Sequence, residues 1–293
     1  MKSGIVVLVG RSNVGKSTLL NTLVGTKIAA TSFRAQLTRN IIHGVLNMPG
    51  NEEHVGGQAV FVDTPGVFKD KKSALTSKLT GKVTQALHGI DLIIYVVDPT
   101  REIGVEERAV YGMIRHTNTP KILVINKSEL SPEERMYQDT YLEWADDFDA
   151  VLPLSALRAS HITPLKEKVM DLLPEGPPLY GEEQLTNIDN LFWIGEIIRE
   201  KIFSVMDKEV PYSIAVEVDS AEDKVTANKK EIFSISARIL TDEDRYKRII
   251  IGSKGARIKE IGQMARKELE QALNKKIFLE LEVEVDRHWV ERL

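Results

Sequence analysis

Residues 10–17 read Gly10-Arg11-Ser12-Asn13-Val14-Gly15-Lys16-Ser17, and they follow directly after the apolar segment Ile5–Val9. This order predicts a buried strand, a glycine-rich turn and a helix that begins at about Lys16. The glycines let successive backbone N–H groups converge on one point, and the helix N-terminus adds partial positive charge. Lys16 can then reach the β- and γ-phosphates of a nucleotide, and the Ser17 hydroxyl is placed to hold Mg²⁺. We therefore predict a phosphate-binding loop (P-loop) that takes a nucleoside triphosphate.

The composition is typical of a globular protein large enough for two domains. The 293 residues are 42% hydrophobic and 28% charged, with a formal net charge of −4. Because the chain has no cysteine, disulfides, thiolate zinc sites and cysteine nucleophiles are excluded. The apolar run at 90–97 is far shorter than the ~20 residues of a membrane-spanning helix. The predicted first strand leaves no room for a signal peptide, so we expect a cytoplasmic protein.

The first part of the chain alternates short apolar segments with longer amphipathic ones, as in a mostly parallel sheet covered by helices. The second and third apolar segments are expected to form a hairpin, because the glycines and proline between them favour turns. We predict an α/β P-loop domain over residues 1–172 with a six-stranded, mostly parallel sheet. Its strands are expected at Ile5–Val9, Ile41–Leu46, Ala59–Val62, Leu92–Val97, Ile122–Ile125 and Val151–Leu154.

A proline-rich stretch, Leu173-Pro174-Glu175-Gly176-Pro177-Pro178, interrupts this pattern. Prolines cannot continue a helix or pair in a central strand, so we predict a linker over residues 173–187. Residues 188–293 then follow the order α-β-β-α-α-β of a smaller α+β domain. Helices are expected at about 188–206 and about 257–273, and a short helix is expected to end near residue 251. The first two strands are expected at 213–218 and 232–240. In the last strand, Ile277, Leu279, Leu281, Val283 and Val285 alternate with acidic residues, which predicts one buried face.

Four further motifs resemble, in their order along the chain, the nucleotide-binding motifs of small GTPases. Asp63-Thr64-Pro65-Gly66 resembles the motif whose carboxylate holds Mg²⁺ through water and whose glycine N–H faces the γ-phosphate. Asn126-Lys127-Ser128-Glu129 resembles the guanine-reading motif, and Ser155-Ala156-Leu157 resembles a loop whose backbone contacts the base. Thr38 lies in a segment similar to the switch whose threonine joins Mg²⁺ only when the γ-phosphate is present.

The resemblance implies GTP as substrate and Mg²⁺ held by Ser17, Thr38 and Asp63. The residues that it implies for nucleotide binding are Gly10, Arg11, Ser12, Asn13, Val14, Gly15, Lys16, Ser17, Thr18, Asp63, Thr64, Pro65, Gly66, Val67, Asn126, Lys127, Ser128, Glu129, Ser155, Ala156 and Leu157.

Two positions depart from the usual GTPase pattern. Glu129 stands where the guanine reader usually has aspartate, so we expect the preference for GTP over ATP to survive, with weaker affinity. Val67 follows the glycine of the second motif, where some GTPases carry a water-orienting glutamine, so we expect slow intrinsic hydrolysis. Two interpretations of Asn13 stay open: it holds K⁺ near the phosphates in place of an arginine finger, or it only caps the loop. The predicted catalytic residues are Lys16, Thr38, Gly66 and Asn13.

Near the C-terminus, two predicted helices are joined by Ile251-Gly252-Ser253-Lys254-Gly255-Ala256. Basic residues gather around this loop with no acidic residue between Arg245 and Lys259, which indicates a phosphate-backbone partner. The KH fold clamps single-stranded nucleic acid with such a glycine loop, and α-β-β-α-α-β is the order of a type II KH domain. A solvated charged helix is the alternative. The predicted RNA-binding residues are Arg248, Gly252, Ser253, Lys254, Gly255, Arg257 and Lys259.

A P-loop GTPase domain followed by a type II KH domain resembles the Era family, and the resemblance covers nearly the whole chain. It rests on GRSNVGKST (10–18), QLTRN (36–40), VDTPGV (62–67), NKSE (126–129), LSAL (154–157) and IIIGSKGARIKEIGQMARKELEQAL (249–273). The resemblance implies GTP hydrolysis, binding to the 3′ end of small-subunit ribosomal RNA and a role in assembly and maturation of the small ribosomal subunit. It also implies peripheral association with the inner face of the cell membrane in some members. We expect a monomer.

Two other functions stay open at this point. One is an RNA-binding module whose GTP site is a switch with negligible turnover, and the other is a different translation-linked GTPase with an unrelated tail. Steady-state phosphate release separates the first from an enzyme. RNA crosslinking at residues 252–255 would exclude the second.

Overall fold

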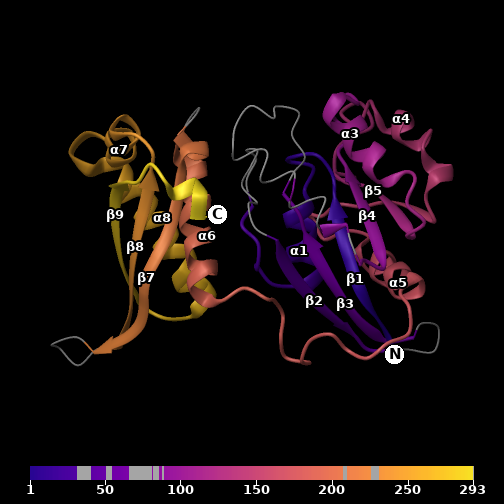
Figure 1. Ribbon diagram of the computed structural model, residues 1–293, viewed down its shortest axis with the longest axis horizontal. Coiled ribbons are helices and arrows are strands. Elements are labelled where there is room, and N and C mark those ends of the chain that lie inside the picture. The colour runs from indigo at the N-terminus through magenta and orange to yellow at the C-terminus, as the bar shows by residue number, and fades with distance from the viewer. Residues whose placement is uncertain are drawn as a thin grey trace. The chain divides into compact units, whose positions relative to one another are not determined.

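The computed structural model describes residues 1–31, 41–50, 55–65, 81, 86–87, 89–206, 210–225 and 231–292 (Figure 1). The chain divides into two compact units, residues 1–187 and 188–293. Each unit has its own sheet. No helix in the described part of the chain combines the length and apolar character that a bilayer crossing requires.

The first unit is built on a six-stranded sheet with the strand order β2-β3-β1-β4-β5-β6. β2 pairs antiparallel with β3, and every other neighbouring pair in this sheet is parallel. This confirms the predicted hairpin and the mostly parallel sheet. The strands span Lys2–Val9 (β1), Ile42–Met48 (β2), Gly57–Asp63 (β3), Leu92–Val97 (β4), Lys121–Ile125 (β5) and Ala150–Pro153 (β6).

Helices cover both faces of this sheet, which explains why β4 and residues 5–9 of β1 are continuous apolar runs. Helices α1 (Lys16–Val24) and α5 (Ile162–Leu172) pack together on one face. Helices α3 (Val105–Ile114) and α4 (Gln138–Leu142) lie on the other face (Figure 1). Their residues Val110 and Tyr141 are buried in the core on that side. Strand order reverses at β1, whose neighbours are β3 and β4, and such a switch point opens a crevice at the carboxyl ends of the strands. The P-loop follows β1 at this crevice.

Residues 173–187, which the sequence predicts as a linker, belong to the first unit and lie along its sheet. Their backbone finds partners on three strands: the Ser3 N–H donates to the Pro174 carbonyl (3.0 Å), and the Val45 N–H donates to the Leu185 carbonyl (2.9 Å). The buried Gln58 side chain accepts from the Leu179 and Tyr180 N–H groups at 2.7 and 2.8 Å. We call residues 173–187 the strap, because they run along the edge of the sheet. The strap can contain prolines because its backbone forms hydrogen bonds to the strands at only a few positions.

The second unit has the predicted order α-β-β-α-α-β around a three-stranded sheet, β7-β8-β9. β7 pairs antiparallel with β8, and β9 pairs parallel with β8. Along β9 the buried Ile277 and Val283 alternate with exposed acidic residues, as the sequence predicts. The elements span Asn190–Val205 (α6), Ile214–Val225 (β7), Glu231–Thr241 (β8), Asp244–Ile251 (α7), Ala256–Leu273 (α8) and Ile277–Val285 (β9).

Candidate nucleotide site and nucleic-acid interface

The P-loop joins β1 to α1, and two of its residues adopt backbone conformations that explain the sequence. Gly15 has φ +101°, and a Cβ there would lie 2.3 Å from Asn126 Nδ2, so a larger residue is excluded. Asn13 has φ +63°, a left-handed conformation that asparagine tolerates better than most residues. The left-handed turns aim successive N–H groups toward one side, which makes the loop an anion-binding concavity.

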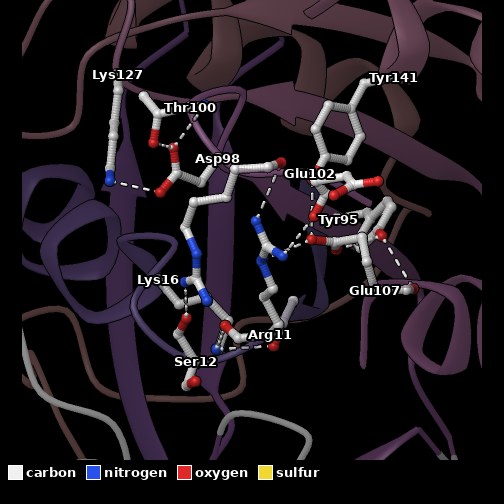
Figure 2. A network of polar contacts seen from close by, with 12 residues as sticks. Arg11, Ser12, Lys16, Tyr95, Asp98, Thr100, Glu102, Glu107, Lys127 and Tyr141 are labelled. Carbon is white, nitrogen blue, oxygen red and sulfur yellow. Dashed lines mark hydrogen bonds and ion pairs between the residues drawn. The ribbon is translucent and has the colours of Figure 1, made fainter. Parts of the chain in front are cut away.

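Lys16 is buried at the base of this loop (Figure 2). Its Nζ donates to the carbonyls of Gly10 (3.0 Å) and Arg11 (3.1 Å). Burial lowers the pKa of Lys16, while the charges of Asp63 and Glu107 oppose this shift. An ammonium group held in the loop by two carbonyls is suited to bind a phosphate of high negative charge.

Two hard oxygen ligands meet beside the loop. The Ser17 hydroxyl, on the first turn of α1, donates to Asp63 Oδ2 at 2.5 Å, and Asp63 ends β3 and is buried. The next residue, Thr64, fixes the end of this strand because its hydroxyl donates to the Leu8 carbonyl at 2.8 Å. Hydroxyl and carboxylate oxygens are the ligands that Mg²⁺ prefers, so this pair fits the metal that the sequence predicts.

Asn126 follows β5 and connects three segments of the site. Its Nδ2 donates to the Val14 carbonyl in the P-loop at 2.8 Å, and its Oδ1 accepts from the Ala156 N–H at 2.9 Å. The Ala156 carbonyl in turn accepts from the Thr22 hydroxyl of α1 at 2.8 Å. One buried amide therefore fixes the distance between the P-loop and the loop predicted to contact the base.

Lys127 has φ +64°, and its ammonium forms an ion pair with Asp98 Oδ2 at 2.5 Å (Figure 2). Asp98 follows β4 and also accepts from the Thr100 hydroxyl at 2.8 Å. Burial raises the pKa of Asp98, but the hydrogen bonds from Lys127 and Thr100 outweigh burial and leave this pKa below its ordinary value. This ion pair fixes the position of the Lys127 side chain at the carboxyl ends of the strands.

Glu129 lines a cavity of about 680 Å³ beside this loop, together with Ser128 and Ser155. Three basic residues, Arg135, Arg158 and His161, are also among the residues that line this cavity. Within the described residues, Glu129 Oε2 is buried and has no hydrogen-bond partner. A buried carboxylate oxygen in this state is a strong acceptor for donor groups of a ligand.

The structure brings the predicted nucleotide residues together at the carboxyl ends of β1, β3, β5 and β6, with two qualifications. Arg11 contributes only its backbone to the loop, because its side chain turns away to a buried ion pair with Glu107 (2.9 Å). Leu157 is 71% exposed at the outer end of its loop. Three predicted residues, Thr38, Gly66 and Val67, lie outside the described residues.

The glycine loop of the second unit lies between α7 and α8. Gly252 has φ +72° and ψ 177°, a conformation essentially restricted to glycine, and a Cβ there would lie 2.9 Å from Arg257 Cγ. Gly255 has φ +76°, with open space around a Cβ except for Ile258 Cγ2 at 4.0 Å. The predicted side chains Arg248, Ser253, Lys254, Arg257 and Lys259 are all exposed around this loop.

A groove of about 340 Å³ continues from this loop between α8 and β9. Leu279 and Leu281 line it from the strand, and Lys259, Gly262 and Arg266 line it from the helix. An apolar floor beside basic side chains suits a nucleic-acid strand, whose bases and phosphates need opposite surroundings. Sequence reasoning missed Gly262 and Arg266, although the spacing of 259, 262 and 266 places all three on one helix face.

Comparisons with known proteins agree with both predicted domains, the P-loop GTPase domain and the KH domain. Residues 5–127 match the family described as 50S ribosome-binding GTPase, and residues 209–290 match the KH domain family. GTPase Era from Thermoanaerobacter sp. (strain X514) is 40% identical over 290 residues, covering 98% of this chain and 92% of that protein. The chain belongs to the Era GTPase family. GTPase Era from Geobacter sp. (strain M21) is 41% identical over 298 residues, covering 98% of this chain and 94% of that protein.

Two solved Era structures share the fold over the full chain. The crystal structure of an Aquifex aeolicus Era variant bound to GDP·AlF4⁻ covers 100% of this chain and 96% of its own, with a TM-score of 0.88 and 37% identity. The structure of Era in complex with MgGDPNP and nucleotides 1506–1542 of 16S ribosomal RNA gives the same TM-score and coverage at 36% identity. The protein is thus an Era-family GTPase, a hydrolase that acts on GTP, and the alternative of a GTPase with an unrelated tail is excluded.

Proposed function

We propose that this GTPase couples a guanine-nucleotide site on the first unit to the binding of small-subunit ribosomal RNA by the second. The observation that carries the nucleotide half is the convergence of Lys16, the Ser17–Asp63 pair and the Asn126–Ala156 contact at one edge of the sheet. In this proposal Lys16 and the P-loop amides bind the phosphates. The Asn126 amide holds the P-loop and the base-contacting loop at a fixed distance from each other.

Ser17 and Asp63 would hold Mg²⁺, with Thr38 as the third predicted ligand. Mg²⁺ supplies charge neutralisation on the phosphates when it is bound. The protein's own part is to present the ligands: Asp63 fixes the Ser17 hydroxyl before any metal arrives, which lowers the cost of ordering it. Thr38 and Gly66 are proposed to contact the γ-phosphate, since both lie within switch-like motifs.

Glu129 is proposed to read guanine, because its buried Oε2 can accept from the donors that guanine has and adenine lacks. The test is discrimination between GTP and ATP in Glu129→Asp and Glu129→Ala. We expect the aspartate variant to retain guanine preference and the alanine variant to lose it. An alanine variant with the wild-type preference would show that another group reads the base.

The RNA half rests on the exposed basic side chains around residues 252–255, on the groove between α8 and β9, and on the related Era bound to a 16S ribosomal RNA fragment. We propose that the second unit binds the 3′ end of small-subunit ribosomal RNA and that the protein assists maturation of the small ribosomal subunit. We propose that a protein with this role is located in the cytoplasm. Peripheral membrane association stays a prediction from the family resemblance.

Calorimetry on Lys16→Ala tests the nucleotide half directly. The variant loses a buried charge-assisted contact to phosphate, so GTP binding should become undetectable. Lys168→Ala, on helix α5 of the same unit and half-buried, is the matched control and should bind as the wild type does. Wild-type affinity in Lys16→Ala would contradict the proposal. Steady-state phosphate release then measures how slow the intrinsic turnover is.

A further inference from the structure

The P-loop and the segment that joins β4 to α3 each send one arginine side chain to the backbone of the other. From the P-loop, Arg11 Nη1 donates to the Glu102 carbonyl at 3.0 Å and Nη2 donates to the Arg101 carbonyl at 3.4 Å. From the joining segment, Arg101 Nη1 donates to the Ser12 carbonyl at 3.2 Å. The two segments are about 90 residues apart in sequence, yet each holds the backbone of the other.

The Arg11 end of this clasp is anchored in the core of the unit. Arg11 Nε lies 2.9 Å from Glu107 Oε2, and both side chains are buried. The Tyr95 hydroxyl donates to Glu107 Oε1 at 2.5 Å, and the Tyr141 hydroxyl donates to Oε2 at 3.0 Å (Figure 2). Because a buried ion pair is tolerated only when its remaining acceptors are satisfied, the two tyrosines make this anchor geometrically specific.

The Arg101 end acts on a single peptide group of the P-loop. In a planar trans peptide, the N–H of a residue points opposite to the carbonyl of the residue before it. Holding the Ser12 carbonyl toward Arg101 therefore turns the Asn13 N–H to the other side of the loop. Arg101 itself is exposed and is not part of the core, so its contact with Ser12 has no packing role to explain it.

We infer that Arg101 is a positioning residue for the P-loop, which fixes the direction of the Asn13 N–H, and that Glu107 supports the same loop through Arg11. The inference rests on the proposed role of the P-loop in phosphate binding. Without Arg101, the Ser12–Asn13 peptide can rotate, and nucleotide binding must first select the productive orientation. Affinity for nucleotide should therefore fall although no residue that touches phosphate has changed.

The test is GDP affinity by calorimetry for Arg101→Gln and Arg101→Lys. We expect Arg101→Gln to raise the Kd for GDP about tenfold, the effect of one lost charge-assisted hydrogen bond. Arg101→Lys keeps one cationic donor and should recover part of this loss. The control is Arg108→Gln, an exposed arginine on α3 whose side chain makes no hydrogen bond or ion pair within the described residues, and it should bind as the wild type does.

The backbone amide of Asn13 gives a readout that overall stability would not move. Adding GDP changes the chemical shift of this amide in two-dimensional ¹⁵N NMR. We expect the size of this change to differ from the wild-type value in Arg101→Gln and to equal it in Arg108→Gln. Equal thermal unfolding of the two variants is expected because both positions are exposed. Wild-type GDP affinity together with a wild-type Asn13 amide in Arg101→Gln would overturn the inference.

The role of Glu107 is tested against a second buried glutamate–arginine pair, which serves as the control. Glu196 bonds Arg199 within α6 of the other unit, with Oε1 accepting from Nε at 2.8 Å. Glu107→Gln and Glu196→Gln should both lower the unfolding temperature, but only Glu107→Gln should raise the Kd for GDP. Equal Kd values in the two would remove Glu107 from the inference. If Lys16→Ala still bound GDP, the proposed phosphate site would fail instead, which separates the two failures.

Discussion

Replacing Asn126 with alanine should destabilise the first unit and weaken nucleotide binding together. The side chain is 4% exposed and bonds the Val14 carbonyl at 2.8 Å and the Ala156 N–H at 2.9 Å. Alanine removes both hydrogen bonds and leaves a buried acceptor and a buried donor without a partner. Each such group costs about 1–3 kcal/mol, and partial access of water to the loops favours the lower end. We therefore expect the free energy of unfolding to fall by about 2 kcal/mol.

Urea unfolding of Asn126→Ala, Asn126→Asp and the exposed control Asn118→Ala measures this effect. Asn126→Asp keeps an acceptor for the Ala156 N–H but sets a carboxylate oxygen against the Val14 carbonyl, so its loss should be at least as large. GDP affinity should fall in both variants at position 126, because the P-loop and the base loop are no longer tied. A change in Asn126→Ala within about 0.5 kcal/mol of wild type, the range of ordinary surface substitutions, would refute this reasoning.

Other predictions concern the buried ring of His43, the proposed K⁺ contact of Asn13 and the RNA loop. Burial lowers the pKa of His43 below 6.5, so its contribution to stability is present above pH 6.5 and lost as pH falls through the folded-state pKa. The unfolding free energy of the wild type should therefore drop more between pH 7.5 and 5.5 than that of His43→Gln; equal drops would count against burial of this ring. Replacing K⁺ with Na⁺ at constant ionic strength should slow GTP turnover, and Asn13→Ala should erase the difference; equal rates in the two salts would leave Asn13 as a loop cap. Gly255→Asp should weaken RNA binding more than Gly255→Asn, because the two side chains have the same shape and both adopt φ > 0, and only the first repels phosphate. Equal affinities would exclude close phosphate approach at this loop.

The sequence predicts the architecture because local pattern and position agree. Buried strands such as Leu92–Val97 are continuous apolar runs. The P-loop and the motifs that begin at Asp63, Asn126 and Ser155 lie at the carboxyl ends of strands, so parallel pairing brings these motifs to one edge. In the second unit, alternation along Ile277–Val285 predicts a strand with one buried face, as the structure shows. These features need no knowledge of distant partners.

The contacts that hold the site depend on distant partners and escaped prediction. Glu107 has the sequence context of an ordinary helix surface residue, and only the packing of α3 against β4 shows that it is buried beside Arg11. Asp98 could have been suspected, since it directly follows a buried strand at the carboxyl edge. The strap at 173–187 reads as a linker because its prolines break regular structure, while its anchor Gln58 lies more than 100 residues earlier.

The most direct test of the proposed function is the affinity for an RNA fragment equivalent to nucleotides 1506–1542 of 16S ribosomal RNA, measured with GDP and with GDPNP. The switch segments can contact a γ-phosphate only before hydrolysis, so the two nucleotide states should present the second unit differently to RNA. We predict tighter RNA binding with GDPNP than with GDP, strong weakening by salt, and an equal reciprocal effect of RNA on nucleotide affinity. Equal RNA affinity in the two nucleotide states would contradict the coupling, and no binding in either state would contradict the proposed RNA partner.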